Sequence, residues 1–364
     1  MKELEQWIQD MTLIPALSGY ENKMADYLTK EIQPFTNSVE IDPIGNVIAR
    51  IDGREKNSPK VMIFAHMDQL GLVVRKIDDN GFIQFERLGG VPEKVLPGLK
   101  VQVKTEDDEY IPGVIGNKSH HITPPNEKTQ VIPYLDLYID LGANSKEEVQ
   151  SLGIDVGCPI IYEPSFQKLA NNKVAGTSID NRGGCACLLS IAKALKNNQT
   201  DATVYLVGTV LEEYNLRGAM IAARKISPDL AICIDVCPSG DTPDTKDRSD
   251  IRLGRGPIIS MYSFHGRGTL NGTIPHPKLV KHITDTAKQA GINIQKSALT
   301  GILTDLSYVQ LELGSIPSID LAFAARYTHS PVEVCDLEDI ASLCNLLSQF
   351  INQINSSINL KRWE

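Results

Sequence analysis

The sequence has no apolar run of the length, about 18 residues, that a membrane-spanning helix requires. Its N-terminal segment, MKELEQWIQDMTLI, is acidic and amphipathic and lacks the apolar stretch of a signal peptide. The chain also has fewer basic than acidic residues, which gives it a formal net charge of −9. Such a deficit argues against nonspecific binding to nucleic acid or to an anionic membrane surface. We therefore expect a cytoplasmic protein without a nucleic-acid or membrane partner.

The cysteines lack the pattern of a disulfide framework. Their number, 7, is odd, and most of them stand in apolar runs, so we expect reduced, buried thiols. Cys185 and Cys187 have the spacing CxC, which a zinc–thiolate site also uses. Because no second cysteine pair stands at zinc-finger spacing, a structural role for these thiols is favoured.

The chain has 364 residues, of which 42% are hydrophobic. This is enough for about two domains, or for one domain with a large insertion. Residues 1–72 and 164–364 alternate between strand-like runs and helical patterns, which is typical of an α/β domain with a mostly parallel sheet and helices on both faces. Residues 73–163 instead show short alternating strands between Gly, Pro and Asp turns, as a small β barrel or sandwich does. The sequence therefore predicts one α/β domain interrupted by an inserted β domain.

Apolar runs in the α/β regions predict buried strands. The expected strands are Lys60–His66, Thr203–Val210, Leu230–Val236 and, as the last one, Ile319–Ala322. Helices are expected at Glu21–Ile32, Asn181–Leu195, Gly218–Arg224 and Leu337–Ile351.

Acidic residues and histidines stand at or near the ends of these strands and at the start of one helix. They are His66, Asp68, Asp180, Glu212, Glu213, Asp235 and His329. Because the carboxyl ends of parallel strands meet at one edge of a sheet, we expect these side chains to lie close together. Imidazole and carboxylate groups are ligands of divalent metals, and this inventory suffices for two ions about 3.5–4 Å apart. The pattern therefore predicts a two-metal hydrolase.

Taken singly, most of these residues have plainer explanations. Asp180 suits a helix N-cap, and His329 is an ordinary loop residue. Asp68 faces the same side as His66, so its carboxylate can accept a hydrogen bond from the ring nitrogen that does not bind metal; otherwise the pair is a surface histidine and a turn-capping aspartate. The adjacent pair Glu212 and Glu213 is the stronger signal, since neighbouring carboxylates at a buried strand end repel each other unless a cation is present. One of them would bind metal and the other would act as general base.

These residues, in their order and spacing, resemble the M42 family of metallo-aminopeptidases, which includes tetrahedral and glutamyl aminopeptidases and proteins once labelled endoglucanases. The motifs that carry the resemblance are AHMDQLGL, GVIGNKSHH, AGTSIDNRGG, EEYNLRGA and RYTHSPVEV, and the likeness covers nearly the whole chain. It implies a zinc-peptidase-type sheet flanked by helices, with an inserted PDZ-like β domain used for oligomerisation. It also implies a homo-oligomer, commonly a tetrahedral dodecamer.

The resemblance further assigns roles to the seven residues. His66, Asp180 and Asp235 would hold one metal ion, while Asp180, Glu213 and His329 would hold the second, with Asp180 bridging. Glu212 would be the catalytic base, and Asp68 would orient His66 from behind. A cis peptide bond is expected between Asp180 and Asn181.

The chain departs from the usual family pattern at three places near these motifs. Tyr214 and Asn215 stand where a Val-Gly pair is typical, residues 236–239 read VCPS where a Thr-His pair is common, and a late segment reads GILTDLS, with Asp305 kept. None of these changes removes an expected ligand. They concern the wall of the pocket, so the preferred N-terminal residue does not follow from the resemblance.

The sequence therefore favours an aminopeptidase that uses two divalent metal ions, Zn²⁺ or Co²⁺, to release N-terminal residues from peptides. A metal-independent glycoside hydrolase is one alternative, but such enzymes need two carboxylates across a sugar-binding cleft. Histidines among the clustered residues and an aromatic content of only 6% count against it. The other alternative is an inactive oligomeric binding protein on the same fold, against which the complete ligand set argues.

Overall fold

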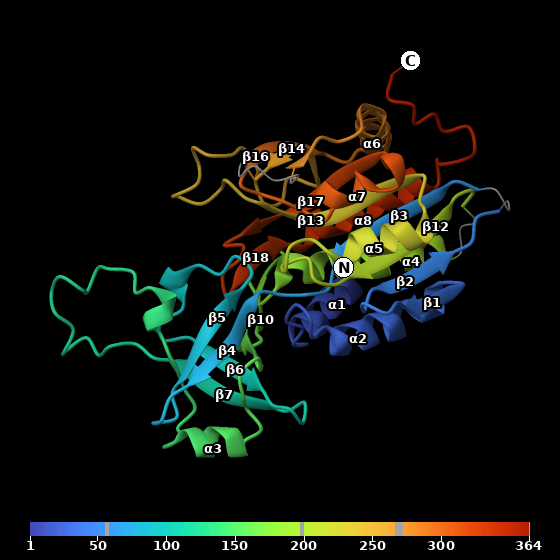
Figure 1. Cartoon of the computed structure of the whole chain (residues 1–364). Coiled ribbons are helices and arrows are strands. Elements are labelled where there is room, and N and C mark those ends of the chain that lie inside the picture. The colour runs from blue at the N-terminus through green and yellow to red at the C-terminus, as the bar shows by residue number, and fades with distance from the viewer. Residues whose placement is uncertain (55–57, 197–199, 266–271, 364) are drawn as a thin grey trace.

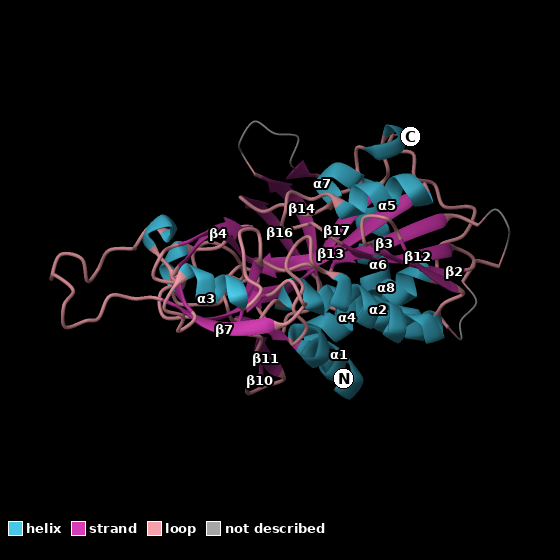
Figure 2. Cartoon of the chain, turned by 60° about the horizontal axis from the view of Figure 1, so that its bottom comes forward, coloured by secondary structure: helices cyan, strands magenta, loops and turns pink. Residues whose placement is uncertain are grey.

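The computed structural model describes residues 1–54, 58–196, 200–265 and 272–363 (Figure 1). Its strands form two sheets, a 12-stranded mixed sheet and a closed barrel. Helices flank the large sheet, and the barrel lies beside one end of it (Figures 1 and 2). None of the helices in these ranges is both long and apolar enough to cross a bilayer.

The centre of the large sheet is parallel. Its strands are, in spatial order, β12 (Thr203–Thr209), β3 (Lys60–His66), β13 (Leu230–Pro238) and β17 (Ser318–Arg326). On one side follow the antiparallel strands β2 (Val47–Ile51) and β1 (Ser38–Ile41), and on the other β18 (Glu333–Asp336), β11 (Lys173–Gly176) and β10 (Phe166–Lys168). A branch from β17 holds β14 (Ile258–Phe264), β15 (Gly272–Thr273) and β16 (Gln295–Thr300).

The sequence of β3 explains why it lies at the centre. Its run KVMIFAH is apolar at successive positions, so both faces of the strand can be covered. Val61 and Ile63 belong to the core under one face, whereas Met62 and Phe64 belong to the core under the other. A single strand thereby joins two helical layers.

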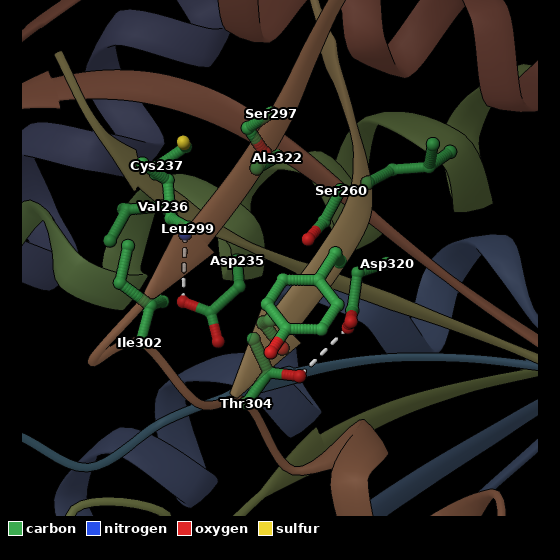
Figure 3. Close-up of a pocket in the computed structure, with 13 residues that line it drawn as sticks. Asp235, Val236, Cys237, Ser260, Ser297, Leu299, Ile302, Thr304, Asp320 and Ala322 are labelled. Carbon is green, nitrogen blue, oxygen red and sulfur yellow. Dashed lines mark hydrogen bonds between the residues drawn. The ribbon is translucent and has the colours of Figure 1, made fainter. Parts of the chain in front are cut away.

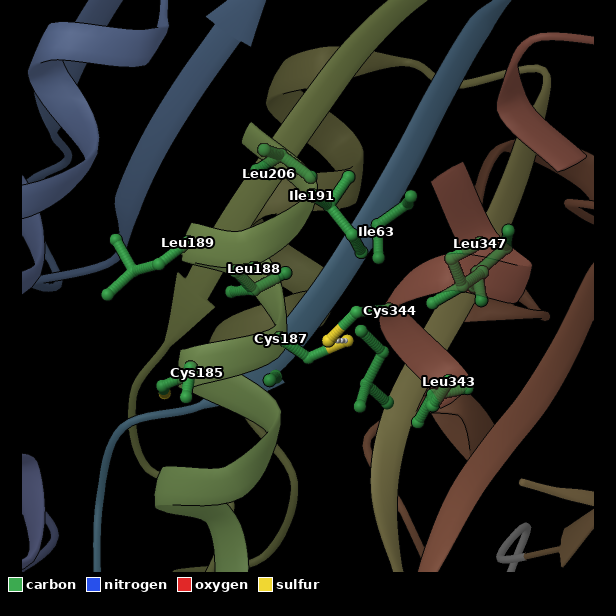
Figure 4. Close-up of a cluster of buried hydrophobic side chains, with 14 of the residues drawn as sticks. Ile63, Cys185, Cys187, Leu188, Leu189, Ile191, Leu206, Leu343, Cys344 and Leu347 are labelled. Atoms are coloured by element: carbon green, nitrogen blue, oxygen red, sulfur yellow. Dashed lines mark hydrogen bonds between the residues drawn. The ribbon is translucent and has the colours of Figure 1, made fainter. Parts of the chain in front are cut away.

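The first layer contains α1 (Lys2–Thr12), α2 (Asn22–Ile32), α4 (Ile179–Leu195), α6 (Pro277–Ala290) and α8 (Leu337–Ile351). The second contains α5 (Gly218–Ile226) and α7 (Leu306–Val309), on the opposite face of the sheet (Figure 2). In the first layer α4 and α8 both pack on the sheet and contact each other, and the thiols of Cys187 and Cys344 meet between them, with their sulfur atoms 2.9 Å apart (Figure 4). All seven cysteines are free thiols and six of them are buried, as predicted.

The barrel is built from six short strands. They are β4 (Gly71–Ile77), β5 (Ile83–Leu88), β6 (Lys100–Lys104), β7 (Tyr110–Ile115), β8 (Ile139–Asp140) and β9 (Pro159–Tyr162). The short helix α3 (Lys146–Ser151) precedes β9. A long connection between β7 and β8 projects away from the barrel (Figure 1).

The structure corrects two expectations about the sheet. It is mixed and not mostly parallel, because most strands outside its centre pair antiparallel, although β14 and β16 pair parallel. Ile319–Ala322 lies within β17 but is not the last strand, since β18 follows it. The strands that escaped prediction are mostly short and lie at the edges; β10, for example, is largely exposed. Edge strands of this kind carry little apolar periodicity to detect.

Gly183 near the start of α4 gives a test of this packing. A Cβ atom there would lie 2.4 Å from Cζ of Phe323 in β17. Glycine to alanine ordinarily stabilises a helix interior by about 1 kcal/mol, but here the added methyl group overpacks the core, which typically costs about 1–3 kcal/mol. We therefore expect Gly183→Ala to lower the free energy of unfolding, as measured by urea denaturation. Ser190→Ala, in the same helix, should change it little, and an equal loss in both variants would contradict this reading.

Candidate metal centre

The structure brings together the five residues that the resemblance assigns as metal ligands. Nε2 of His66 lies 3.1 Å from Oδ1 of Asp180 and 3.9 Å from Oδ1 of Asp235. Nε2 of His329 lies 3.8 Å from Oδ2 of Asp180 and 4.0 Å from Oε1 of Glu213. The two oxygens of Asp180 thus face different histidines.

These side chains come from strands of the large sheet, from the start of α4 and from loops that follow strands. His66 ends β3, Asp235 lies in β13, Asp180 stands at the start of α4, and the paired glutamates follow β12. His329 lies in the connection between β17 and β18. All of them line one cavity of about 530 Å³. The peptide bond between Asp180 and Asn181 is cis, as predicted.

Burial dominates the electrostatics of the cluster. It raises the pKa values of Glu212, Glu213 and Asp235 well above their usual range, and neighbouring carboxylates raise them further. Burial lowers the pKa of His66, but the carboxylates of Glu212 and Asp180 outweigh it and raise that pKa well above its usual value. The site therefore concentrates negative charge where water cannot disperse it, which favours a bound cation.

Asp68 does more than the sequence suggested. Nδ1 of His66 lies 3.2 Å from the backbone carbonyl oxygen of Asp68 and 3.5 Å from its carboxylate. The carboxylate accepts hydrogen bonds from the backbone N–H groups of Glu212 and Glu213, at 3.0 and 2.9 Å, and from the hydroxyl of Ser18. It therefore orients the imidazole and also fixes the backbone that carries both glutamates.

Glu333 is a further residue of the site that sequence reasoning missed. It is buried in β18, and its two carboxylate oxygens accept the backbone N–H groups of Asp180 and His329, each at 2.8 Å. One side chain thus fixes the backbone at two of the ligand candidates. Its position four residues after His329, in THSPVE, was the available signal.

Arg182 was missed as well, although it is fully buried. It donates to the backbone carbonyl oxygens of Met11, Ile14 and Met67 and to the side-chain oxygen of Gln69. These bonds tie the first turn of α4 to the segment that follows His66. Such a network connects residues far apart in sequence, so no local motif reveals it.

The barrel also reaches the site. Nδ1 of His329 lies 3.3 Å from the carbonyl oxygen of Gly90, which follows β5. A Cβ at Gly90 would lie 2.7 Å from that nitrogen, so a glycine is required for this approach. The carbonyl accepts from Nδ1–H and leaves Nε2 free to face Asp180, which is the tautomer that a metal ligand needs.

Comparison with known proteins agrees with this geometry. A profile of the M42 glutamyl aminopeptidase family matches residues 45–346. The chain belongs to the M42 peptidase family, and it is therefore a peptide-bond hydrolase. Among its relatives, the SgcX protein of Escherichia coli (strain K12) is 41% identical over 92% of this chain and 89% of its own.

Two solved structures extend the comparison. The aminopeptidase APDkam598 from Desulfurococcus kamchatkensis superposes with a TM-score of 0.91 at 34% identity, covering 99% of both chains. The TET1 peptidase of Pyrococcus horikoshii gives a TM-score of 0.85 at 30% identity, over 96% of this chain and 100% of its own. That peptidase is described as assembling into a tetrahedron or a large octahedral shell.

The donor set fits divalent metal ions. One ligand atom from each of His66, Asp180 and Glu213 lies within 4.8 Å of the other two. Ligands around a zinc ion sit about 2.0–2.2 Å from it, so such atoms close around an ion with small movements. Mixed imidazole and carboxylate ligands suit several divalent transition metals, among them Zn²⁺, Co²⁺ and Mn²⁺.

We expect Glu333→Gln to weaken metal binding. A glutamine offers one acceptor oxygen where the structure uses two, so either Asp180 or His329 loses its backbone anchor. Loss of such an indirect support typically lowers metal affinity about 10–100-fold. Metal content after dialysis against graded chelator measures the effect, and Glu338→Gln, on the exposed side of α8, is the control. Equal metal affinity in both variants would show that Glu333 is dispensable.

Proposed function

We propose that this chain releases N-terminal residues from peptides by means of two divalent metal ions, Zn²⁺ or Co²⁺, held at the candidate centre. The observation that carries the proposal is the position of Asp180, whose two carboxylate oxygens face His66 on one side and His329 on the other. A carboxylate placed in this way suits a bridge between two ions.

In this assignment His66, Asp180 and Asp235 would hold one ion, and Asp180, Glu213 and His329 would hold the other. When bound, such ions act as Lewis acids toward the scissile carbonyl and lower the pKa of water. Their positive charge also offsets the buried carboxylates, which otherwise repel one another.

Glu212 is the proposed general base. It lines the same cavity as the ligands and is buried beside His66. Its carboxylate would take a proton from the attacking water and return it to the leaving amine. Asp68 would hold Glu212 in place through the backbone N–H group.

The sequence left two alternatives, a metal-independent glycoside hydrolase and an inactive binding protein. A metal-independent glycosidase has no use for two histidines facing a shared carboxylate, and the family is one of peptidases. An inactive binding protein on this fold disagrees with membership of a peptidase family, and measured turnover of a peptide would exclude it.

Glu212→Gln should retain the metal ions and lose turnover. The amide keeps the size of the side chain and leaves the ligand candidates unchanged, but it cannot accept the proton. We expect kcat to fall on the order of 100-fold or more, while metal content stays near that of the wild type. Glu106→Gln, on an exposed turn of the barrel, serves as control. Near-normal peptidase activity in Glu212→Gln would assign the base to another group.

We further propose that residues 73–163 form a PDZ-like oligomerisation domain inserted between residues 1–72 and 164–364, and that the chain assembles into a tetrahedral dodecamer. The barrel and its projecting connection expose apolar side chains, among them Ile122 at 74% and Val131 at 55%. Exposed apolar surface of this kind suits contact with another subunit. The free cysteines accord with a cytoplasmic location, which stays a prediction.

Light scattering tests the assembly. The wild-type chain should have a mass many times that of the 40.0 kDa subunit. The double variant Ile122→Glu with Val131→Glu places charge on the projecting connection and should give smaller species. Leu13→Glu, which changes an exposed leucine next to α1, should leave the mass unchanged. A monomeric wild-type protein with full peptidase activity would refute the proposed assembly.

A further inference from the structure

Apart from the ligand candidates and Glu212, the described lining of the metal-centre cavity holds three polar side chains, Asn215, His265 and Thr328, and three glycines. Its remaining residues form an aliphatic wall of Leu216, Val236, Pro238, Ile302 and Leu303. These residues come from three separate segments, which follow β12, end β13 and link β16 to α7. Leu216 and Val236 are themselves buried, so this wall is a fixed part of the fold. It includes two of the places where the sequence departs from the family pattern.

No lysine or arginine lines this cavity within the described ranges. The carboxylates that line it are the four already assigned, Asp180, Glu213 and Asp235 as ligands and Glu212 as base. None of them remains to receive a cationic side chain of a substrate. A charged substrate side chain packed against the five aliphatic residues would lose its hydration without gaining a counter-charge from them, which is unfavourable; the imidazole of His265 lines another part of the cavity.

A second, small cavity lies directly behind the wall. Figure 3 shows Val236 and Ile302 beside Asp235, and these three residues line both cavities. The hidden cavity holds about 20 Å³, which is room for a single water molecule. Leu299 and Tyr262 also line it. Ile302 therefore separates the metal-centre cavity from unused space.

We propose that this aliphatic wall receives the side chain of the substrate's first residue and makes the enzyme selective for neutral, apolar N-terminal residues. The proposal rests on the proposed aminopeptidase function and specifies its substrate class. It differs from what the name of the family profile, glutamyl aminopeptidase, would suggest for this chain. Ile302 sets the depth of the subsite, because its side chain closes off the small cavity behind it.

The first experiment compares leucyl, glutamyl and lysyl anilides with the metal-loaded wild-type enzyme. We expect kcat/KM for the leucyl substrate to exceed that for each charged substrate by about 10-fold or more, since a well-fitted apolar pocket discriminates at this level. Faster turnover of the glutamyl or lysyl substrate would overturn the inference while leaving the aminopeptidase function intact. No turnover of any peptide or anilide would instead overturn the proposed function.

If no peptide or anilide is turned over, a binding measurement still tests the inference. Calorimetry with the free amino acids should show that leucine binds the metal-loaded wild-type protein about 10-fold more tightly than glutamate or lysine. Equal or tighter binding of the charged amino acids would overturn the inference, whatever the turnover.

The second experiment changes the wall. Leu303→Lys places an ammonium group at the cavity and should raise the ratio of glutamyl to leucyl kcat/KM by about 10-fold or more. Leu311→Lys makes the same substitution at an exposed leucine that does not line the cavity, and it should leave the ratio unchanged. A ratio that moves equally in both variants, or in neither, would show that Leu303 does not face the substrate side chain.

The third experiment tests the role of Ile302. Ile302→Ala should join the two cavities and raise the ratio of phenylalanyl to valyl kcat/KM about 10-fold. The control is Val280→Ala in α6, at a partly buried position of the core away from the cavity. It measures the effect of loosening the core packing in general. An unchanged phenylalanyl-to-valyl ratio in Ile302→Ala would place the substrate side chain elsewhere.

Discussion

The constraint on which the structure depends is the burial of several carboxylates at one edge of a parallel sheet. Glu213, Asp235 and Glu333 all lie in the same small region as Asp180, and burial raises the pKa of each of these three acids well above its usual value. The imidazole of His66 supplies at most one positive charge. Such a group of acids is unfavourable unless positive charge joins it, so the fold maintains a site that favours a bound cation.

Hydrogen bonds between backbone N–H groups and buried carboxylates fix the geometry of this site. Asp68 holds the backbone of both paired glutamates, and Glu333 holds the backbone of Asp180 and of His329. Both carboxylates therefore bind backbone N–H groups, and the side chains of the proposed ligands stay free to bind metal. Buried Arg182 extends the same principle, because it fastens the segment after His66 to the start of α4. The ligand candidates converge although they come from five places in the sequence.

Much of this arrangement could be predicted from the sequence, for a physical reason. The central strands are buried on both faces and read as continuous apolar runs, so their ends are easy to place, and polar residues at those ends fall at one sheet edge. Glu333 escaped because β18 is only four residues long and carries no readable pattern. Two hydrogen-bond partners of Asp68, the backbone N–H groups of Glu212 and Glu213, escaped because they lie on a loop more than 140 residues away. Short edge strands such as β10 and β15 escaped because exposure removes their apolar signal.

The two halves of the candidate centre differ in how firmly they are held. His66 ends a central strand and is 3% exposed, whereas the side chain of His329 stands on a loop and is 41% exposed. The backbone of His329 has a φ of 64°, and its ring is positioned by Gly90 from the barrel and its backbone by Glu333 from β18. A glycine is needed at position 90 because any side chain would meet the imidazole. The barrel therefore takes part in building the second half of the site. Forces that act on the barrel, such as contact with another subunit, would reach His329 through the backbone of Gly90, while His66 would remain fixed by the sheet.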